Sequence, residues 1–299
     1  MFVSDLFDRY INLHRSDLGE IRINRYRFVQ RCVNEFNLVH LGKSKADVKV
    51  LNKEWRDGFK QFMMNRFNYK PSTINGYLKV LHAAVRYACN TNHIEKFPFN
   101  DCKFEKVEQT IKYLTDEEYL SIANFDFSKA DERIQRTADC FLFACNTGLA
   151  ISDLRSFNKS NLERDKDGSL SIVKYRDKTK VRFLVPLNKL ALSIIEKYRL
   201  HQDIVGTDLL LPVIHINDFN HLLKMIALMC GVNKNLTSHV ARHTFATTNW
   251  LNNGGSLESL QSMLGHSKIQ TTEIYGQITD EKVKSEASLV FSNQAKKGA

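Results

Sequence analysis

The sequence predicts a mainly α-helical chain of two domains with one small β-hairpin in the second domain. Three observations carry this prediction. The 299 residues exceed one typical domain. Apolar residues recur at helical spacing through most of the chain. One pair of runs rich in β-branched and aromatic residues interrupts the helical pattern of the second half.

The charge is uneven along the chain. The formal net charge is +10, and residues 1–105 hold 18 Lys and Arg against 11 Asp and Glu. This excess favours a polyanionic partner, and nucleic acid before a membrane, because no basic helix with a broad apolar face stands out. A basic protein without such a partner stays an open alternative. No apolar run approaches the roughly 20 residues that span a bilayer, and the N-terminus lacks a signal-peptide cleavage site, so a cytoplasmic protein is predicted.

The six cysteines are scattered, without a CxxC pair and without histidines at zinc-finger spacing. We therefore expect neither a metal site nor a disulfide framework. Cys145 falls in a helical pattern, where a buried core residue is a more common role than a nucleophile.

The first domain, residues 1–105, is predicted to be helical. Apolar spacing indicates one helix over residues 24–41, and Pro71 is typical of the start of another. The second helix has an apolar face formed by Ile74, Leu78, Leu81, Val85 and Ala88. Its polar residues are either solvated or contact DNA phosphates, and the candidates for DNA contact are Ser72, Asn75, Lys79 and Arg86.

Residues 106–113 are predicted to be a linker, and residues 114–299 a second domain. Thr115 and Glu118 have the spacing of a capping box, which marks a helix start. The runs 170–175 and 181–186 predict a hairpin with Lys178 at or near its tip.

His239 and Arg242 are three residues apart in a predicted helix, so their side chains would share one face. Thr237 and Ser238 are possible caps, which would put the pair in a first turn, where the helix dipole favours an anion. The H-x-x-R spacing is weak evidence by itself.

A predicted helix ends at Gly265, and His266 follows it directly. Ser267 is the expected N-cap of a next helix, with Tyr275 near its end. A tyrosine at such a position is most often a half-buried packing residue. Together, however, the candidate groups suit phosphoryl transfer without a metal, in which a tyrosine oxygen attacks and fixed positive donors stabilise the phosphate: Lys178, His239, Arg242, His266 and Tyr275.

The ordered motifs resemble those of the tyrosine recombinases, the phage-type integrase superfamily. They are TGLxxSDL at 147–154, the hairpin lysine, HVARH and LGHSKIQTTEIY. The overall sequence is similar to integrases of conjugative-transposon type. The resemblance covers the chain from about Leu114 onward. The N-terminal segments FVSDLFDRYI and STINGYLKVLHAAVRYA resemble, less specifically, the SAM-like helical core-binding domain of that family. The implied architecture is a two-domain DNA clamp.

The resemblance also implies a role for each candidate. Tyr275 would attack the scissile phosphate and form a 3′-phosphotyrosyl link with a free 5′-hydroxyl. Arg242 would hold the phosphate through two hydrogen bonds. His239 and His266 would bind phosphate oxygens and assist proton transfer, and Lys178 would protonate the departing 5′-oxygen. No metal or nucleotide would be required.

One position departs from the family pattern. An arginine normally follows TGL, but this chain has Ala150 there. Arg136 or Arg155 is a candidate to replace it, and some integrases of conjugative-transposon type are similar in having a small residue at this position. An impaired enzyme is the remaining explanation, because loss of one preorganised donor costs on the order of 10²–10³ in rate.

The resemblance implies double-stranded DNA with recombination sites as the partner, with DNA-bending or directionality factors as accessory partners. It also implies assembly as a homo-tetramer through a C-terminal tail with Ala287, Leu289, Val290 and Phe291. A tail that packs against its own subunit stays an open alternative. Three other functions stay open: a type IB topoisomerase-like enzyme, a DNA-binding protein of the same fold that no longer cleaves, and a basic helical protein with accidental motifs.

Overall fold

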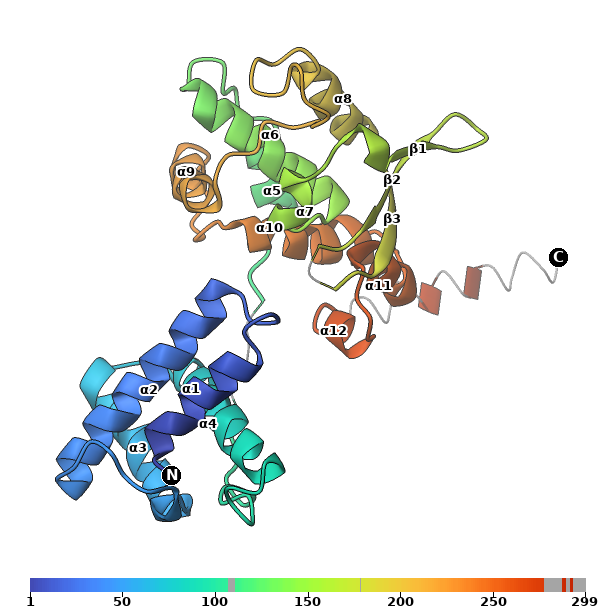
Figure 1. Ribbon diagram of the computed structural model, residues 1–299. Helices are drawn as coiled ribbons and strands as arrows, with labels where there is room; N and C mark the ends of the chain where they lie inside the picture. The colour runs from blue at the N-terminus through green and yellow to red at the C-terminus, as the bar shows by residue number, and fades with distance from the viewer. Residues whose placement is uncertain (107–110, 178, 277–286, 289–290, 293–299) are drawn as a thin grey trace. The chain divides into compact units, whose positions relative to one another are not determined.

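The computed structural model describes residues 1–106, 111–177, 179–276, 287–288 and 291–292, and the chain divides into two compact units, residues 1–109 and 110–299. The division falls within the segment 106–113 that was predicted as a linker. Helices dominate both units, and one three-stranded antiparallel sheet lies in the second (Figure 1). The mainly helical fold class with a small sheet is therefore confirmed.

The described part of the first unit is built from helices around its own apolar core. Its elements are α1 (Val3–Leu13), α2 (Glu20–Leu41), the short 3-10 helix η1 (Val48–Val50), α3 (Lys53–Phe67) and α4 (Pro71–Asn90). The predicted helix over 24–41 is the main part of α2. Pro71 is the first residue of α4, where its missing N–H leaves no partner unsatisfied.

The second unit begins with a helical layer. Its helices before the sheet are α5 (Asp116–Ala123), α6 (Glu132–Thr147), α7 (Ile151–Arg155) and the 3-10 helix η2 (Lys159–Asn161). The predicted capping box is confirmed at the start of α5, where the Glu118 N–H donates to Thr115 Oγ1 and the Thr115 N–H donates to Glu118 Oε2.

The sheet follows in the order β1 (Leu162–Arg164), β2 (Leu170–Tyr175) and β3 (Arg182–Pro186). The pairing of β2 with β3 confirms the predicted hairpin. The strand β1 was not predicted, because three residues are too few to show an alternating pattern.

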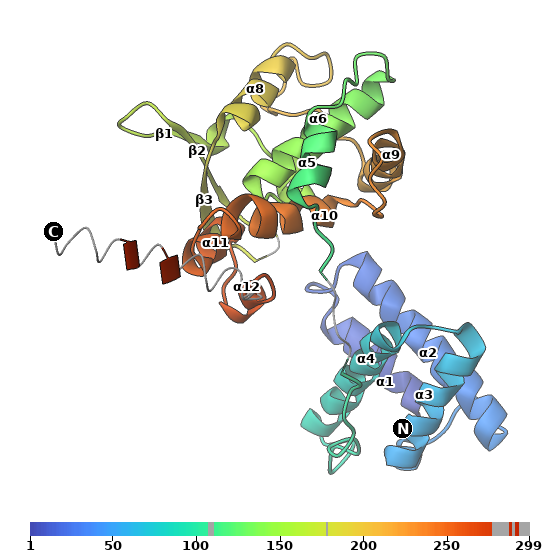
Figure 2. The ribbon, with the colours of Figure 1, turned by 180° about the vertical axis from the view of Figure 1, so that it is seen from behind.

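The helices after the sheet complete the second unit. They are α8 (Lys189–Tyr198), α9 (Ile216–Met229), α10 (Ser238–Thr244), the π-helix η3 (Phe245–Leu251), α11 (Leu257–Leu264) and α12 (Gln270–Glu273). Seen from both sides, α11 lies against β3, and α10 runs directly into η3 (Figures 1 and 2).

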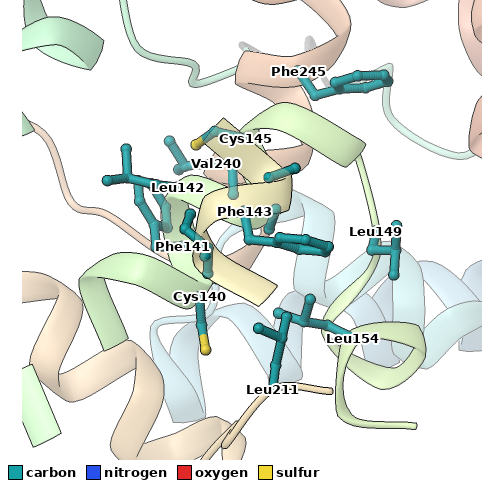
Figure 3. Close-up of a cluster of buried hydrophobic side chains, with 14 of the residues drawn as sticks. Cys140, Phe141, Leu142, Phe143, Cys145, Leu149, Leu154, Leu211, Val240 and Phe245 are labelled. Carbon is teal, nitrogen blue, oxygen red and sulfur yellow. The ribbon is translucent and has the colours of Figure 1, made fainter. Parts of the chain in front are cut away.

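Helix α6 forms the centre of the second unit's core. Its residues Cys140 to Cys145 are packed among Leu149, Leu154, Leu211, Val240 and Phe245 (Figure 3). Burial raises the pKa of the Cys145 thiol well above its usual value, so Cys145 is an unreactive packing residue, as the sequence favoured.

Candidate active site

Helix α10 presents the H-x-x-R pair. The helix begins at Ser238, whose N–H donates to Asn220 Oδ1 at 2.9 Å, and Thr237 occupies the N-cap position without a side-chain cap bond. His239 and Arg242 therefore lie in the first turns, three residues apart on one face, as predicted. His239 is exposed, whereas Arg242 is only 8% exposed.

Arg242 is held in place by two carbonyl groups and an imidazole. Its Nη1 donates to Gly148 O at 2.6 Å, and its Nη2 donates to Leu264 O at 2.6 Å. Nη2 also lies 3.1 Å from His266 Nε2. Since a guanidinium only donates, Nε2 of His266 is the acceptor in that contact. These bonds join the turns after α6 and α11 to α10, segments far apart in the sequence.

The tautomer of His266 follows from this contact. Because Nε2 accepts, the neutral ring carries its proton on Nδ1, which lies 2.9 Å from Thr272 Oγ1 and donates to it. Burial, followed by the charges of Arg242 and Arg176, lowers the pKa of His266 to about 4. His266 is thus a neutral, oriented neighbour of Arg242 at pH 7.

Tyr275 enters the same site from the turn after α12. Its side chain is 7% exposed, and its Oη lies 3.0 Å from His243 Nδ1. Burial raises the pKa of Tyr275, and the nearby guanidinium groups of Arg242 and Arg176 partly offset that rise. The phenol and the Arg242 guanidinium therefore face one common site.

The local structure before Tyr275 differs from the prediction. Ser267 was expected to cap a helix reaching Tyr275, but α12 spans only Gln270–Glu273 and its N-cap is Ile269. The prediction was wrong because Ser267 and Lys268 form a bend instead of a helix start. The C-cap at Gly265 is confirmed, with φ of +59°.

Arg176 is a site residue that the sequence analysis missed. It follows β2 directly, its Nη1 donates to Leu264 O at 3.1 Å, and its Nε lies 3.3 Å from Oδ2 of the buried Asp153. That ion pair has no well-aligned hydrogen bond. Arg176 and Arg242 thus donate to the same carbonyl oxygen, which puts two guanidinium groups side by side.

Their proximity has an electrostatic effect. Burial and the charge of Arg176 lower the pKa of Arg242 to about 10, so Arg242 stays positively charged at pH 7. Two adjacent positive charges in a desolvated site repel each other and attract an anion such as a phosphodiester.

The two arginines that the sequence offered in place of Ala150 lie elsewhere. Arg136 forms an ion pair with Asp203. It lies twelve residues before Gly148, about 18 Å along the axis of α6 at 1.5 Å per residue. Arg155 is the exposed last residue of α7. Lys178 falls outside the described residues.

The candidate DNA contacts of the first unit all lie on α4. Ser72, Lys79 and Arg86 are exposed, whereas the side-chain amide of Asn75 donates to Glu105 O at 2.8 Å. Lys79 and Arg86 also lie over the rings of aromatic residues, Phe104 and Phe97. Asn75 already has an intramolecular partner, so it is the weakest of the four candidates.

Within the residues that the structure describes, no group of three or more His, Cys, Asp or Glu side chains could hold a metal ion. Over the same residues, no helix combines the length and the apolar character needed to cross a membrane. The chemistry of this site is that of a phenol, imidazole rings and two guanidinium groups.

Comparison with known proteins identifies relatives over nearly the whole chain. Residues 112–282 match the model of the phage integrase family, and residues 2–111 match that of the phage integrase SAM-like domain. The tyrosine recombinase XerD of Listeria monocytogenes serotype 4b (strain F2365) is 33% identical over 297 residues, which cover 94% of this chain and 97% of that protein. XerC of Syntrophus aciditrophicus (strain SB) is 24% identical, and the match covers 90% of each.

Solved structures share the fold at lower identity. The Tn1549 transposon integrase in complex with transposon right end DNA has a TM-score of 0.70 at 20% identity, covering 96% of this chain and 99% of that one. A lambda integrase dimer bound to a COC′ core site has a TM-score of 0.69 at 16% identity, covering 94% and 79%. XerH bound to a palindromic difH substrate has a TM-score of 0.72 at 17% identity, covering 95% and 84%.

Proposed function

Because the chain belongs to the phage integrase family and is a tyrosine-type site-specific DNA recombinase, we propose that it cuts and rejoins DNA through a 3′-phosphotyrosyl intermediate on Tyr275. The observation that supports this most strongly is the meeting of the Tyr275 phenol with the buried Arg242 guanidinium in one site. A phenol next to a fixed cation is suited to in-line attack on a phosphodiester.

Each remaining group has a role in this proposal. Arg242 holds the non-bridging phosphate oxygens, and His266, neutral and oriented by Thr272, accepts from Arg242 and so positions its guanidinium. His239 lies on the same face of α10 and contributes a further donor. Lys178, from the hairpin, protonates the departing 5′-oxygen. The phosphotyrosyl link preserves the energy of the phosphodiester, so religation needs no nucleotide, and in this proposal guanidinium groups stabilise the phosphate without a metal.

We further propose that Arg176 supplies the guanidinium that the family usually carries at position 150. Its contact with Leu264 O, which Arg242 also contacts, supports this role. The buried carboxylate of Asp153 forms an ion pair with the Arg176 guanidinium. Ala150, 9% exposed, is then a packing residue at the start of α7 and not a sign of an impaired enzyme.

The proposed substrate is duplex DNA carrying recombination sites. Proteins that share this fold include a lambda integrase dimer bound to a core site and a transposon integrase in complex with transposon DNA, which supports assembly of several copies on DNA. We propose a tetramer during strand exchange, with DNA-bending or directionality factors as accessory partners. The tail that was predicted to join the copies falls largely outside the described residues.

A suicide substrate tests the proposal. Fragmented genomic DNA of the source organism is incubated with the chain, denatured, and sequenced where it stays attached to protein. A duplex of that sequence, nicked beside the cut so that the 5′-hydroxyl fragment diffuses away, should trap wild-type chain as a covalent adduct on Tyr275. Tyr275→Phe should bind the duplex and form no adduct.

The alternatives predict other results. A DNA-binding protein of this fold that no longer cleaves would bind its site and never give an adduct. A type IB topoisomerase-like enzyme would relax supercoiled plasmid as a monomer without exchanging strands between two sites. An adduct that persists in Tyr275→Phe would contradict the assignment of the nucleophile.

A further inference from the structure

We propose that His243 is the base that takes the proton of Tyr275 when the phenol attacks DNA. The inference rests on the proposed role of Tyr275 as nucleophile. Nδ1 of His243 lies 3.0 Å from Tyr275 Oη, within the range required of a proton acceptor. His243 directly follows Arg242 on α10, so one helix presents both the phosphate-binding cation and this base.

Tyr275 needs such a base because its phenol is protonated in the resting site. Burial raises the pKa of Tyr275 above the ordinary value of a phenol, even though Arg242 and Arg176 pull it down. At neutral pH the oxygen therefore carries a proton that must leave as the bond to phosphorus forms.

His243 is ready to accept that proton. Burial, followed by the charges of His239 and Arg242, lowers the pKa of His243 to about 4, so the ring is neutral at pH 7. With its own proton on Nε2, the ring accepts at Nδ1, and the phenol of Tyr275 is the donor. When an anionic phosphodiester enters the site, its charge raises the proton affinity of the nearby imidazole. Substrate binding thus strengthens the base at the stage when it acts.

His266 is oriented for another task. Its Nε2 accepts from Arg242, and its Nδ1 donates to Thr272 Oγ1, so both ring nitrogens are engaged away from the phenol. This arrangement divides the work between two neutral imidazoles: His266 faces the phosphate-binding guanidinium, and His243 faces the nucleophile.

The step is balanced in both directions. In cleavage, the O–H bond of Tyr275 breaks and its proton moves to His243 Nδ1, while Oη bonds to phosphorus. The bond from phosphorus to the 5′-oxygen breaks, and that oxygen takes a proton from Lys178. In religation the 5′-hydroxyl returns its proton and attacks phosphorus, and the imidazolium of His243 gives its proton back to the departing phenol oxygen.

The first test compares His243→Asn and His243→Ala with wild type on the nicked substrate. We expect covalent adduct to form about 10²–10⁴-fold more slowly in both variants, because an amide can hold a hydrogen bond but cannot take a proton. Binding of the uncut duplex should stay unchanged. His201→Asn is the matched control, since His201 is also partly buried and lies 2.9 Å from Glu132 Oε1, outside the site.

Two chemical probes separate a base from a structural residue. Difluorotyrosine at position 275 has a lower phenol pKa, so the nucleophile depends less on a base. The ratio of the adduct-forming rates of wild type and His243→Asn should therefore fall by about tenfold or more. A substrate with sulfur in place of the bridging 5′-oxygen has a leaving group that needs no acid. It should rescue Lys178→Ala and leave His243→Asn slow.

The outcomes are distinct. Adduct formation by His243→Asn at the wild-type rate, a gap that difluorotyrosine leaves unchanged, or full rescue by the sulfur substrate would each overturn the role of His243 as base. In all three cases wild type still forms the adduct, so the role of Tyr275 stands. If wild type forms no adduct, the proposed function fails, and the inference fails with it.

Discussion

The two arginines of the candidate active site both donate to the Leu264 carbonyl oxygen. Arg242 donates to it at 2.6 Å and Arg176 at 3.1 Å, so one backbone atom sets the spacing between two positive charges. The family pattern described above places an arginine directly after TGL, where this chain has Ala150. We propose that Arg176, which directly follows β2, supplies that charge in this chain, and this proposal accounts for Ala150.

Replacing Arg176 tests this explanation. Arg176→Gln should slow adduct formation on the nicked substrate by about 10²–10³-fold, because one preorganised cation is lost from the phosphate. Binding of the intact duplex, measured by fluorescence anisotropy, should change far less. Arg155→Gln and Arg136→Gln serve as controls and should cleave nearly as fast as wild type. A larger loss in either control than in Arg176→Gln would assign the missing charge to that arginine instead.

The sequence pointed to Arg242, His266 and Tyr275 but not to Arg176 or His243. The first three lie in ordered motifs, whereas Arg176 reaches the site only because Gly265 lets its side chain pass. A Cβ at Gly265 would lie 2.7 Å from Arg176 Cγ. This contact joins the residue after β2 to the end of α11, and the spacing of residues along the sequence does not predict it. One signal was available: Arg176 lies two residues before Lys178, between the two predicted strands of the hairpin.

At the level of secondary structure, elements with strong local signals were predicted well. The capping box of α5, Pro71 at the start of α4 and the β2–β3 pairing all follow from short-range rules. The turn after Gly265 was not predicted, because tertiary contacts of His266 with Arg242 and Thr272 determine its conformation. A cap at Ser267 does not form.

Gly265 allows a test at the level of one helix end. Gly265→Ala combines a positive φ with a clash against Arg176, whereas Gly254→Ala has φ of +85° and open space around it. Both variants should lose about 1–2 kcal/mol of folding stability from the left-handed backbone. Only Gly265→Ala should also lose most of its cleavage activity at a temperature where it is folded. Thermal melts and adduct assays measure the two effects. Equal activity in the two variants would show that the space left by the missing side chain of Gly265 is not needed to position Arg176.

Over the whole molecule, most of the net positive charge lies in the first unit. Residues 1–105 carry 18 basic and 11 acidic side chains, most of the net charge of +10. The exposed Lys79 and Arg86 on α4 are part of this excess. This unit is therefore the one from which we expect the larger share of phosphate contacts that are independent of sequence.

The salt dependence of binding tests this distribution. For the full chain, the logarithm of the association constant should fall linearly with the logarithm of salt concentration. Lys79→Gln and Arg86→Gln should each reduce the slope by about 0.9 for every lost phosphate contact. Asn75→Ala is a useful comparison, since the Asn75 amide already bonds Glu105 O, and it should leave the slope unchanged. Unchanged slopes in the two charge variants would remove α4 from the DNA-contacting surface.

The last rung of the β2–β3 ladder joins Tyr175 to Arg182, and Arg176 comes directly after it, with its N–H donating to Val181 O at 2.9 Å. The tip of a two-stranded ribbon frays more readily than a helix packed in a core. If those few bonds open, the Arg176 guanidinium moves away from the proposed phosphate site while the rest of the domain stays folded. A partner that binds the end of the β2–β3 hairpin would then control DNA cleavage by holding Arg176 in place or by displacing it.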